Sequence, residues 1–525
     1  MKIFKDLKNQ YFLIFVIFLF LFGIYLSMNV GITHDEFHDY YVWEANKNLI
    51  INNLFETNYD SQYLDGGGKF YGVGFHYLSI PFELISNFFL SDTFYSQEVK
   101  SILSKHITVF FLFILSGIFF QKILNLIIQD KFYSNLGGVL YLMYPYLIGH
   151  SFFNVKDIPF LSIWLICTYL MISIAKIIVH KEKVGNKYFA YISIFTALLL
   201  SIRISGLLIF IQYIIMFLLL LNRKNINLNS FLKDYYKQLI LSFFSIFLFF
   251  YILQPSYWEN PFLFFEAIKY MSKHIQTVCT ITLGECMKAQ NLPSTYMPIW
   301  FFFKLPLVIL FGIIMFPLVE KKIVNESFNS LIILTLTFSI FFIILILIVF
   351  EVNLYDEIRQ VMFLLPLIFL ISLTIIYFYS KKIFKIFLSI SILFFLFQNI
   401  ILYPYNYIWI NNFSHFTKIN GIFELDYWGV STKVVADYFN QNKIDEKICI
   451  ITNRNSGVKA LIKNNSCFLS FKNLYKKNQR PFYVAFFERS IKKGSPNSCQ
   501  IVFEEKRQVN FSKEDLILAK IYKCN

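Results

Sequence analysis

The chain has 525 residues, of which 57% are hydrophobic and 20% aromatic, and only 15% carry a charge. Because an average soluble domain has about 25% charged residues, this composition excludes a soluble globule and indicates a polytopic membrane protein. The formal net charge is +15. No zinc-finger spacing or arginine-rich arm points to nucleic acid, so we attribute the positive charge to the positive-inside bias of membrane loops.

The first hydrophobic segment, residues 11–30, is an uncharged run that is long enough to cross a bilayer. The run is longer than the apolar part of a signal peptide, and no small-residue cleavage site follows it. We therefore predict a retained first helix, with Lys2, Lys5 and Lys8 holding the N-terminus in the cytoplasm.

Ten further hydrophobic spans bring the prediction to about eleven transmembrane helices. Residues 69–90 carry Pro81 and several polar side chains, and we expect them to form an interfacial helix along the membrane. The loops then alternate between a basic set and a set rich in acidic and aromatic residues. The positive-inside rule places the second set outside, including residues 31–100 and 254–298. The ten spans are expected at 102–121, 134–149, 158–178, 188–201, 204–221, 238–254, 299–319, 329–350, 358–379 and 383–402.

The composition changes at about residue 403, where the hydrophobic runs shorten to strand length. Residues 447–452 and 482–487 read as strands and residues 432–440 as a helix, which predicts a small α/β domain over 403–525. The transmembrane domain is expected over 1–402, and the predicted topology puts the C-terminal domain outside.

The chain has seven cysteines, and Cys167 lies within a predicted span. The other six fall in the 254–298 loop or the C-terminal domain. An even number on the outer face fits disulfides in an oxidising compartment, although free buried thiols explain them equally well.

Residues 33–39, directly after the first span, hold the first candidate site residues. A carboxylate such as Asp35 or Glu36 at a dry membrane edge can act as a general base, whereas a lone loop acid is more often simply solvated. His34 and His38 have a spacing that can bind zinc, but the protease motif needs glutamate at position 35. We favour histidines that donate hydrogen bonds to the carboxylates, without a metal.

Four charged residues further along the chain are expected on the same outer face. Asp157 is a second carboxylate beside the cation Lys156, although a helix N-cap would also explain it. Arg203 interrupts a hydrophobic hairpin, and an ionisable residue in such a place marks a site by default. Arg359 stands at the mouth of a later span. Arginines suit the binding of phosphate, while snorkelling at the interface is the alternative explanation for each.

The motif Thr33-His-Asp-Glu resembles the acidic motif of GT-C glycosyltransferases, in the branch of protein O-mannosyltransferases and lipid A aminoarabinose transferases. Six further motifs follow in an order that fits a bacterial part of this group, and the resemblance covers most of residues 1–431. They are HSFFNVKDIPF at 150–160, SIRISG at 201–206, QPSYWENP at 254–261, LPSTYMPIWFFFKLP at 292–306, YDEIRQVMFLLP at 355–366 and FELDYWGVS at 423–431.

This resemblance implies a GT-C fold and a polyprenyl-phosphate sugar as donor. It matches Asp35 to the catalytic carboxylate, with Glu36 beside it, and Asp157 to the second loop acid. The site residues that it suggests fall into two further sets: Arg203, Arg359 and Lys156 for the donor phosphate, and His34, His38 and Tyr296 on the acceptor side or in support. Gln360 stands where many relatives have histidine, and the His-Pro-Pro pattern of the eukaryotic mannosyltransferases is missing, so neither mannose nor a protein acceptor follows.

The expected function is that of an inverting glycosyltransferase in a bacterial cytoplasmic membrane, which moves a sugar from the lipid donor to an envelope glycan, lipid or protein. No metal or other cofactor is required when arginines stabilise the phosphate, although a divalent ion could serve the same purpose. The alternatives are a transporter or flippase, an oligosaccharide polymerase or ligase, and a non-catalytic assembly protein. The absence of an internal repeat in the sequence speaks against a transporter.

Overall fold

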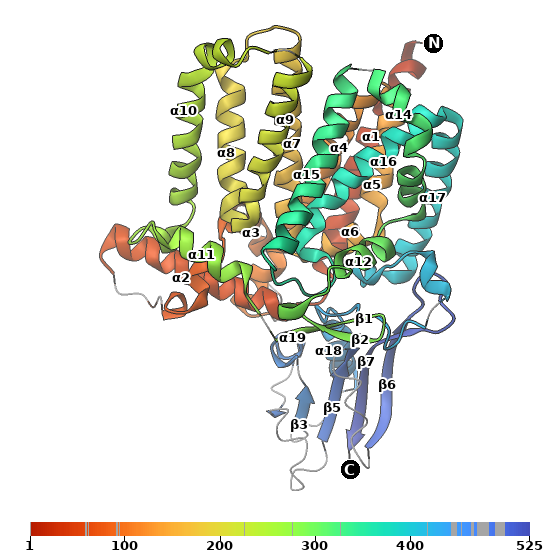
Figure 1. The fold of residues 1–525 in the computed structure, drawn as a ribbon. Helices are drawn as coiled ribbons and strands as arrows, with labels where there is room; N and C mark the ends of the chain where they lie inside the picture. The colour runs from red at the N-terminus through yellow and green to blue at the C-terminus, as the bar shows by residue number, and fades with distance from the viewer. Residues whose placement is uncertain are drawn as a thin grey trace.

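The computed structural model describes residues 2–524 apart from positions 58–59, 61, 91–92, 94, 225, 276, 326, 417, 443–448, 453, 464–466, 470–481 and 489–498. A bundle of long helices carries a small sheet domain at one end, and the N-terminus lies at the opposite end (Figure 1). The predicted placement of the two termini on opposite sides of the helices agrees with this arrangement. Which side is cytoplasmic stays a prediction.

Within the described residues, eight helical segments are long and apolar enough to cross a membrane, or nine if one bent pair counts as a single span. Each of the eight coincides with a predicted span, so the chain is a polytopic membrane protein. The segments are α1 (Lys2–Met28), α4 (Gln97–Ile128), α7 (Asp157–Val179), η3 (Ile204–Leu208) with α9 (Ile209–Arg223), α10 (Leu228–Ile252), α15 (Ser327–Val349), η6 (Arg359–Leu364) with α16 (Leu365–Tyr379), and α17 (Lys381–Leu402).

The three remaining predicted spans are helical but do not form single long helices. α5 (Lys131–Met143) is followed by the short α6 (Pro145–His150), and α8 (Asn186–Ile202) has 17 residues. α12 (Tyr296–Lys304) and α13 (Leu307–Ile314) meet at an angle of 115°. Pro306 lies at this break, where its missing N–H and its effect on the preceding residue end a helix. α14 (Phe316–Asn325) follows as a separate helix.

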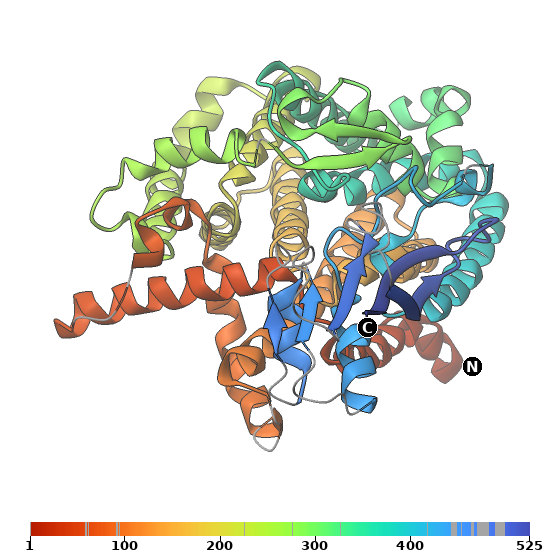
Figure 2. The same cartoon turned by 90° about the horizontal axis from the view of Figure 1, so that it is seen from below.

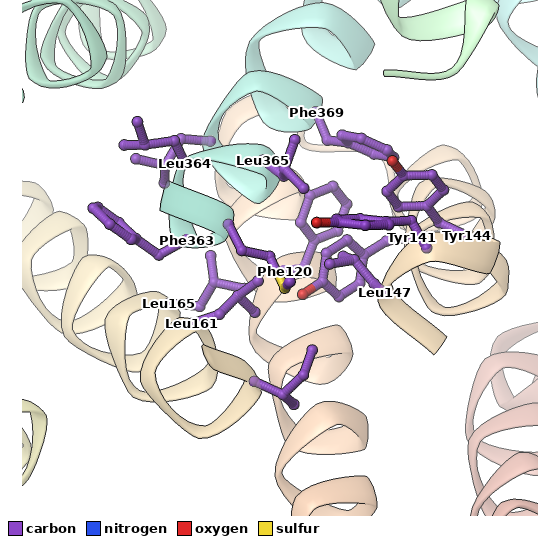
Figure 3. Packing of buried hydrophobic residues seen from close by; sticks show 14 of the residues in the cluster. Phe120, Tyr141, Tyr144, Leu147, Leu161, Leu165, Phe363, Leu364, Leu365 and Phe369 are labelled. Carbon is purple, nitrogen blue, oxygen red and sulfur yellow. The ribbon is translucent and has the colours of Figure 1, made fainter. Parts of the chain in front are cut away.

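The centre of the bundle is formed by α7 and by η6 with α16. In each of these two spans 83% of the most apolar stretch is buried inside the protein, against 17% in α10. Aromatic pairs fill the space around them (Figure 3). The Phe120 and Tyr141 rings stack with centroids 4.5 Å apart, and the Trp164 and Phe363 centroids lie 4.3 Å apart. The outer helices turn their apolar side chains outward, as expected where lipid replaces water.

The end of the bundle that carries the sheet domain, called here the domain-side end, is built from residues 31–100 and 254–298. The first of these segments forms α2 (His34–Phe55), η1 (Gln62–Leu64), η2 (Gly67–Phe70) and α3 (Gly74–Leu90), which contains Pro81. The helix α2 was not predicted, and it extends outward from beside the sheet domain (Figure 2). The predicted segment of residues 69–90 is helical from Gly74 onward, and it does not count among the spans.

The second segment holds the predicted helix and, in addition, a β-hairpin. Its elements are η4 (Pro255–Tyr257), α11 (Leu263–Ser272), the antiparallel strands β1 (Cys279–Thr282) and β2 (Glu285–Lys288), and η5 (Ala289–Asn291). A disulfide between Cys279 and Cys286 joins the two strands.

The C-terminal domain has the predicted α/β character. Its sheet has the order β4-β3-β5-β7-β6, in which β3 is parallel to β4 and β5 while β7 is antiparallel to β5 and β6. The predicted strand of residues 482–487 and the predicted helix are confirmed. The other predicted strand is confirmed over residues 449–452, since residues 447–448 lie outside the described part of the chain. The elements are η7 (Asn406–Ile408), η8 (Asn412–Phe416), α18 (Thr432–Gln441), β3 (Cys449–Thr452), α19 (Asn455–Leu461), β4 (Phe468–Leu469), β5 (Phe482–Phe487), β6 (Cys499–Arg507) and β7 (Leu516–Cys524).

The six cysteines outside the bundle form three disulfides, while Cys167 is free and buried. Cys449–Cys467 links β3 to the residue before β4, and Cys499–Cys524 links the facing ends of β6 and β7. Of the two explanations for the even number, the structure therefore supports disulfides. Disulfides form and persist in oxidising compartments.

The C-terminal domain and the helices share buried side chains. Ile32, Phe37 and Ile102 of the helical part lie in one apolar cluster with Val435 and Val458 of the domain. The segment of residues 403–431 packs within the main core of the bundle through side chains such as Tyr407 and Trp409. The domain is thus docked on the bundle, and the boundary at residue 403 remains a prediction from composition.

Candidate functional site

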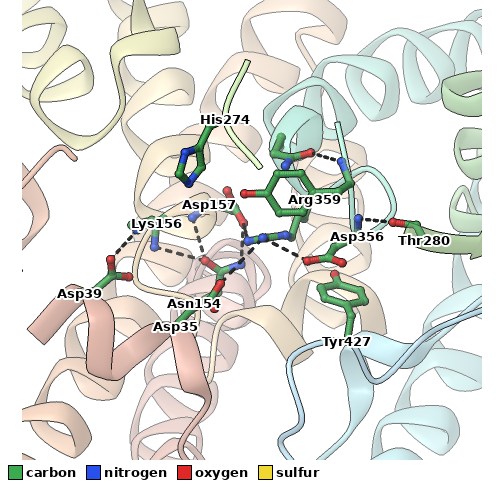
Figure 4. Close-up of polar contacts among 12 residues, drawn as sticks. Asp35, Asp39, Asn154, Lys156, Asp157, His274, Thr280, Asp356, Arg359 and Tyr427 are labelled. Atoms are coloured by element: carbon green, nitrogen blue, oxygen red, sulfur yellow. Dashed lines mark hydrogen bonds and ion pairs between the residues drawn. The ribbon is translucent and has the colours of Figure 1, made fainter. Parts of the chain in front are cut away.

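Seven charged side chains meet at the domain-side end and are called here the charge cluster: Asp35, Asp39, Lys156, Asp157, Arg203, Asp356 and Arg359. They come from four places that are far apart in sequence (Figure 4). The first two lie on successive turns of α2. The next two start α7, Arg203 separates α8 from η3, and the last two lie at the start of η6.

Arg359 is the centre of the charge cluster. Its side chain is only 8% exposed, and its terminal nitrogens lie 3.2 Å from Asp356 and 3.8 Å from both Asp35 and Asp157. The guanidinium also lies over the rings of Tyr355, at 4.9 Å, and Trp428, at 4.6 Å. Aromatic faces and several carboxylates together fix a planar cation in one orientation.

Asp356, one of the carboxylate partners of Arg359, lies in a strained backbone turn. Asp356 and Glu357 both have positive φ angles, 54° and 65°, which residues other than glycine rarely adopt. The backbone N–H of Asp356 donates a hydrogen bond of 2.8 Å to the Thr280 hydroxyl in β1. The hairpin therefore helps to hold the strained turn that presents Asp356 to the arginine, and strain of this kind is concentrated at functional sites.

Asp157 is almost fully buried and binds two arginines. Arg203 donates to one carboxylate oxygen, and Arg359 lies 3.8 Å from the other. Asn154 caps the start of α7, since its side-chain oxygen accepts from the backbone N–H of Asp157 at 2.9 Å while its amide donates to the Asp157 carboxylate at 2.9 Å. Asn154 thus stabilises the start of α7 through its side-chain oxygen, and its amide helps to hold the Asp157 carboxylate in front of the two arginines.

Lys156 forms an ion pair with Asp39, a residue that the sequence analysis did not single out. Its ammonium group also lies 4.1 Å from the centre of the Tyr71 ring. The Tyr71 hydroxyl and His274 of the α11 loop form a hydrogen bond of 2.7 Å, so the 254–298 segment reaches the edge of the charge cluster.

The carboxylates of α2 differ in exposure. The Asp35 side chain is 47% exposed, whereas that of Asp39 is 6% exposed. Burial would raise the pKa of Asp35, but the charges of Arg359, Lys156 and Arg454 outweigh it and leave that pKa lowered. Burial dominates at Asp39 and raises its pKa to about 6 despite Lys156. Asp35 is thus the more accessible carboxylate of the pair, and its ionised form is the more strongly favoured.

Glu36 does not face the charge cluster, in contrast to its predicted place beside Asp35. One oxygen accepts from the backbone N–H of Thr33 at 2.7 Å, and the other lies 2.5 Å from the His106 ring in α4. The second ring nitrogen of His106 lies 2.9 Å from the Ser27 carbonyl, so both nitrogens face acceptors. The Thr-x-x-Glu spacing is a helix-start signature, and it explains why Glu36 turns inward.

The two histidines of the motif also have other partners than the predicted carboxylates. His34 lies 3.2 Å from the Ser456 hydroxyl of α19, and His38 lies 2.5 Å from the Tyr63 hydroxyl. Burial lowers the pKa of His38 to about 4, so the ring is neutral at pH 7. Within the described residues, no group of three or more His, Cys, Asp or Glu side chains is placed to hold a metal ion.

Tyr296, expected on the acceptor side, is buried, and its hydroxyl donates to the Glu357 carbonyl at 3.1 Å. Beside it, Lys304 and the Glu357 carboxylate form an ion pair of 2.8 Å in which both side chains are fully buried. Tyr296 therefore supports the turn that carries Asp356 and does not reach solvent.

A separate cavity of about 500 Å³ lies between α13 and α17, and its lining is almost entirely apolar. It contains none of the charge cluster residues. Side chains that line it include Leu307, Phe311, Phe387 and Trp409. The chemistry of ionised groups therefore belongs to the charge cluster and not to this cavity.

Comparison with known proteins gives matches among solved structures alone, because no family model and no curated protein matches the chain. The chain is similar to ArnT. The structure of ArnT from Cupriavidus metallidurans in the apo state aligns with a TM-score of 0.48 at 8% identity, over 97% of each chain. ArnT bound to undecaprenyl phosphate aligns with a TM-score of 0.45 at 8% identity, over 98% of each chain. Similarity to ArnT at this level transfers no residue roles, so the function has to be inferred from the site itself.

Five of the nine predicted site residues meet in the charge cluster: Asp35, Lys156, Asp157, Arg203 and Arg359. Asp39, Asn154 and Asp356 were not among the predicted site residues. A signal for the first existed, because Asp39 lies four residues after Asp35 and such residues share one face of a helix. The Asn-x-x-Asp spacing of a helix start would have indicated Asn154. The role of Asp356 depends on a strained turn that the sequence does not reveal.

Proposed function

We propose that the protein is an inverting glycosyltransferase of the GT-C type, which moves a sugar from a polyprenyl-phosphate donor to an acceptor on the outer face of the membrane. The observation that carries this proposal is a half-exposed ionised carboxylate, Asp35, that lies 3.8 Å from a fixed arginine, Arg359, at the end of a membrane-spanning bundle. A base and a phosphate-binding cation within one site are what glycosyl transfer from a lipid phosphate requires.

In the proposed reaction, Asp35 accepts the proton of an acceptor hydroxyl or amine. The acceptor atom attacks the anomeric carbon from the side opposite the phosphate, the bond between that carbon and the phosphate oxygen breaks, and polyprenyl phosphate leaves with the electron pair. A lowered pKa keeps Asp35 ionised at pH 7, and a positioned general base of this kind contributes about 10²- to 10⁴-fold to a rate.

Arg359 and Lys156 are the cations assigned to the leaving phosphate. Both are held before substrate arrives, Arg359 by Asp356 and the aromatic rings, Lys156 by Asp39 and Tyr71. Cations that are fixed in advance stabilise the charge that grows in the transition state without reorganisation. Asp157 has a positioning role, because it joins Arg203 to Arg359.

Two observations support action on the outer face. Three disulfides lie in the hairpin and the C-terminal domain at the domain-side end, and disulfides form in oxidising compartments. The lysine-rich loops of the sequence lie between the other ends of the predicted spans. The sugar and the acceptor are not part of the proposal.

The test is the Asp35→Asn variant in membranes supplied with lipid-linked sugar and acceptor. We expect transfer to fall at least about 100-fold, because the variant keeps the shape of the side chain and removes the base. Asp234→Asn is the matched control, since Asp234 is an exposed acid of α10 outside the charge cluster, and we expect it to retain wild-type transfer. Transfer by Asp35→Asn above a tenth of the wild-type rate would contradict the assignment.

A transporter or flippase is the main alternative, and the same preparation separates it. A flippase moves lipid-linked sugar across the bilayer and leaves it intact, whereas the proposed transferase releases polyprenyl phosphate in proportion to glycosylated acceptor. Measuring both products in reconstituted vesicles decides between the two functions.

A further inference from the structure

The C-terminal domain brings one more cation to the site. Arg454 lies between β3 and α19, and its guanidinium donates a hydrogen bond of 2.7 Å to the backbone carbonyl of Tyr427. Gly429 packs against it with a φ of +70°, and a Cβ at that position would lie 3.1 Å from the Arg454 side chain. The absence of a side chain at residue 429 thus leaves room for the arginine beside Tyr427.

Close contacts fix this part of the domain next to Asp35. The Ser456 hydroxyl lies 3.2 Å from the His34 ring, one residue before Asp35. A Cβ on Gly457 would lie 2.7 Å from the carbonyl oxygen of Ile32, so a side chain there would push α19 away. The Thr432 hydroxyl donates to the same carbonyl at 3.0 Å. Residues 454–457 are therefore seated on the turn that leads into α2.

The charges of the cluster leave a place for another cation. Its four carboxylates outnumber its three cations, and each of those cations already has a carboxylate within 4.0 Å: Lys156 has Asp39, Arg203 has Asp157, and Arg359 has Asp35, Asp157 and Asp356. A phosphate that entered here would meet no excess positive charge from the bundle alone. Close binding of a phosphate is strongest where an arginine is available to pair with it.

Arg454 differs from the other cations in this respect. No carboxylate among the described residues lies within 4.0 Å of it in an ion pair, and its buried Nε has no hydrogen-bond partner among those residues. Its charge nevertheless reaches the charge cluster, since Arg454 helps to lower the pKa of Asp35 after the larger effects of Arg359 and Lys156. Arg454 is held by the Tyr427 carbonyl, and the centre of the Tyr427 ring lies 6.0 Å from the Arg359 guanidinium, so Arg454 lies at the side of the charge cluster. Its charge also offsets part of the burial that raises the pKa of Asp426.

We propose that Arg454 of the C-terminal domain binds the phosphate group of the lipid-linked donor, and that the domain is thereby a part of the donor site. The inference rests on the proposed function for the identity of the donor. It assigns a binding role to a domain that the sequence motifs of residues 1–431 leave without one.

The experiment uses the full-length protein in nanodiscs and a polyprenyl monophosphate as the probe. We expect Arg454→Gln to weaken binding about tenfold, because the variant keeps a polar side chain but loses a charge-assisted bond to the phosphate. Arg454→Lys should bind within a few-fold of wild type. Lys459→Met, which removes an exposed cation from α19, the helix that follows Arg454, is the matched control and should bind like wild type.

Inorganic phosphate forms the second arm of the experiment. If the site recognises the lipid-linked phosphate, inorganic phosphate at the same concentration should not displace the probe. Displacement would mean that the site takes free phosphate, and it would overturn the assignment to the donor. Binding by Arg454→Gln equal to that of wild type would overturn the role of Arg454.

A measurement on the wild-type protein covers the case in which Arg454→Gln does not fold. Phenylglyoxal modifies accessible arginines, and mass spectrometry reports the modified fraction at Arg454. The probe should slow modification at least about fivefold, because a phosphate that pairs with the guanidinium blocks the reagent. Equal modification with and without the probe would overturn the inference. Wild-type protein that binds the probe but transfers no sugar would contradict the proposed function and leave the role of Arg454 standing.

Discussion

Two sets of acidic and basic side chains lie near each other at the domain-side end, and they differ in access. In the charge cluster, Asp35 is half-exposed and Arg359 faces three carboxylates at 3.2 to 3.8 Å. In the second set, Lys304 and Glu357 pair with each other at 2.8 Å and are fully buried. Lys304 also donates to the carbonyl of Trp409 at 3.0 Å, which ties it to the segment after α17.

The comparison shows that charged side chains within a membrane protein do not by themselves indicate a catalytic or binding site. The buried pair is closed to any substrate and joins α12 to the turn before η6, so its contribution is to stability. The charge cluster is open on the side of Asp35, and the 3.8 Å contacts of Arg359 to Asp35 and Asp157 are long enough to be exchanged for contacts to a ligand. Neighbouring residues 356 and 357 of one strained turn thus serve different purposes.

The largest effect on stability is expected for Lys304→Met. The change leaves the Glu357 carboxylate buried without its partner, which costs about 3 to 5 kcal/mol. Thermal unfolding in detergent measures the loss, and transfer by the fraction that stays folded should remain near wild type. The double variant Lys304→Met with Glu357→Leu is the control, because replacing both charges by apolar groups should recover most of the loss. A stable Lys304→Met protein without activity would place this pair in the site.

The next effect concerns transfer and not stability. Asp157→Asn should lower transfer about 100-fold, because both Arg203 and Arg359 lose the carboxylate that orients them, and misplaced cations stabilise the transition state poorly. The loss should appear with both saturating and limiting donor. Asp130→Asn, which removes a partly exposed acid paired with Lys381 at the far end of α4, is the matched control. An unfolding temperature that fell with the activity would instead show that Asp157 is structural.

The pH dependence of transfer distinguishes the two acids of α2. A base must be ionised to act, so protonation of Asp35 stops transfer, and the lowered pKa of Asp35 places this loss below about pH 4. The pKa of Asp39 is raised to about 6, so an Asp39 base would halve transfer near that pH. We expect the ratio kcat/KM to be nearly flat from pH 7 to pH 5. A fall near pH 6 that disappears in Asp39→Asn would assign the base to Asp39.

The smallest effect is expected where an ion pair is open to water. Lys47 and Glu44 of α2 lie 2.8 Å apart, but their side chains are 43% and 30% exposed. Glu44→Gln should change the free energy of unfolding by less than about 0.5 kcal/mol, since solvent screens exposed pairs. Measured beside Lys304→Met, it tests whether burial, and not the short distance, determines the worth of an ion pair in this protein.

Much of the fold could be predicted because lipid imposes a simple rule on the sequence. Each of the eleven expected spans falls mainly on helical residues, since backbone groups in a bilayer must be paired within the segment. The rule gives no account of helices that end inside the bundle, so α5 and the α12–α13 bend were expected as plain spans. The same rule does not predict the helices and strands outside the spans, such as α2 and the hairpin of β1 and β2.

The sequence allowed most residues of the charge cluster to be predicted, but not the contacts that they make. Asp35, Asp157, Arg203 and Arg359 could be grouped because loop charges placed them at one end of the spans. Glu36 and Tyr296 could not be separated from them, because the direction of a side chain depends on the packing of α4 and α12. Arg454 was out of reach, since only the docking of α19 on residues 32–34 brings it beside Asp35.

The site joins the beginning of the chain to its end, which has a consequence for synthesis. Asp35 leaves the ribosome first among its residues, while Tyr427, which holds Arg454 and packs against Arg359, follows roughly 400 residues later, about 20 to 80 s at typical elongation rates. Until then the inserted helices carry Asp35 without Tyr427 and Arg454 beside the charge cluster. We therefore expect a nascent or prematurely terminated chain that ends before Arg454 to lack the complete site.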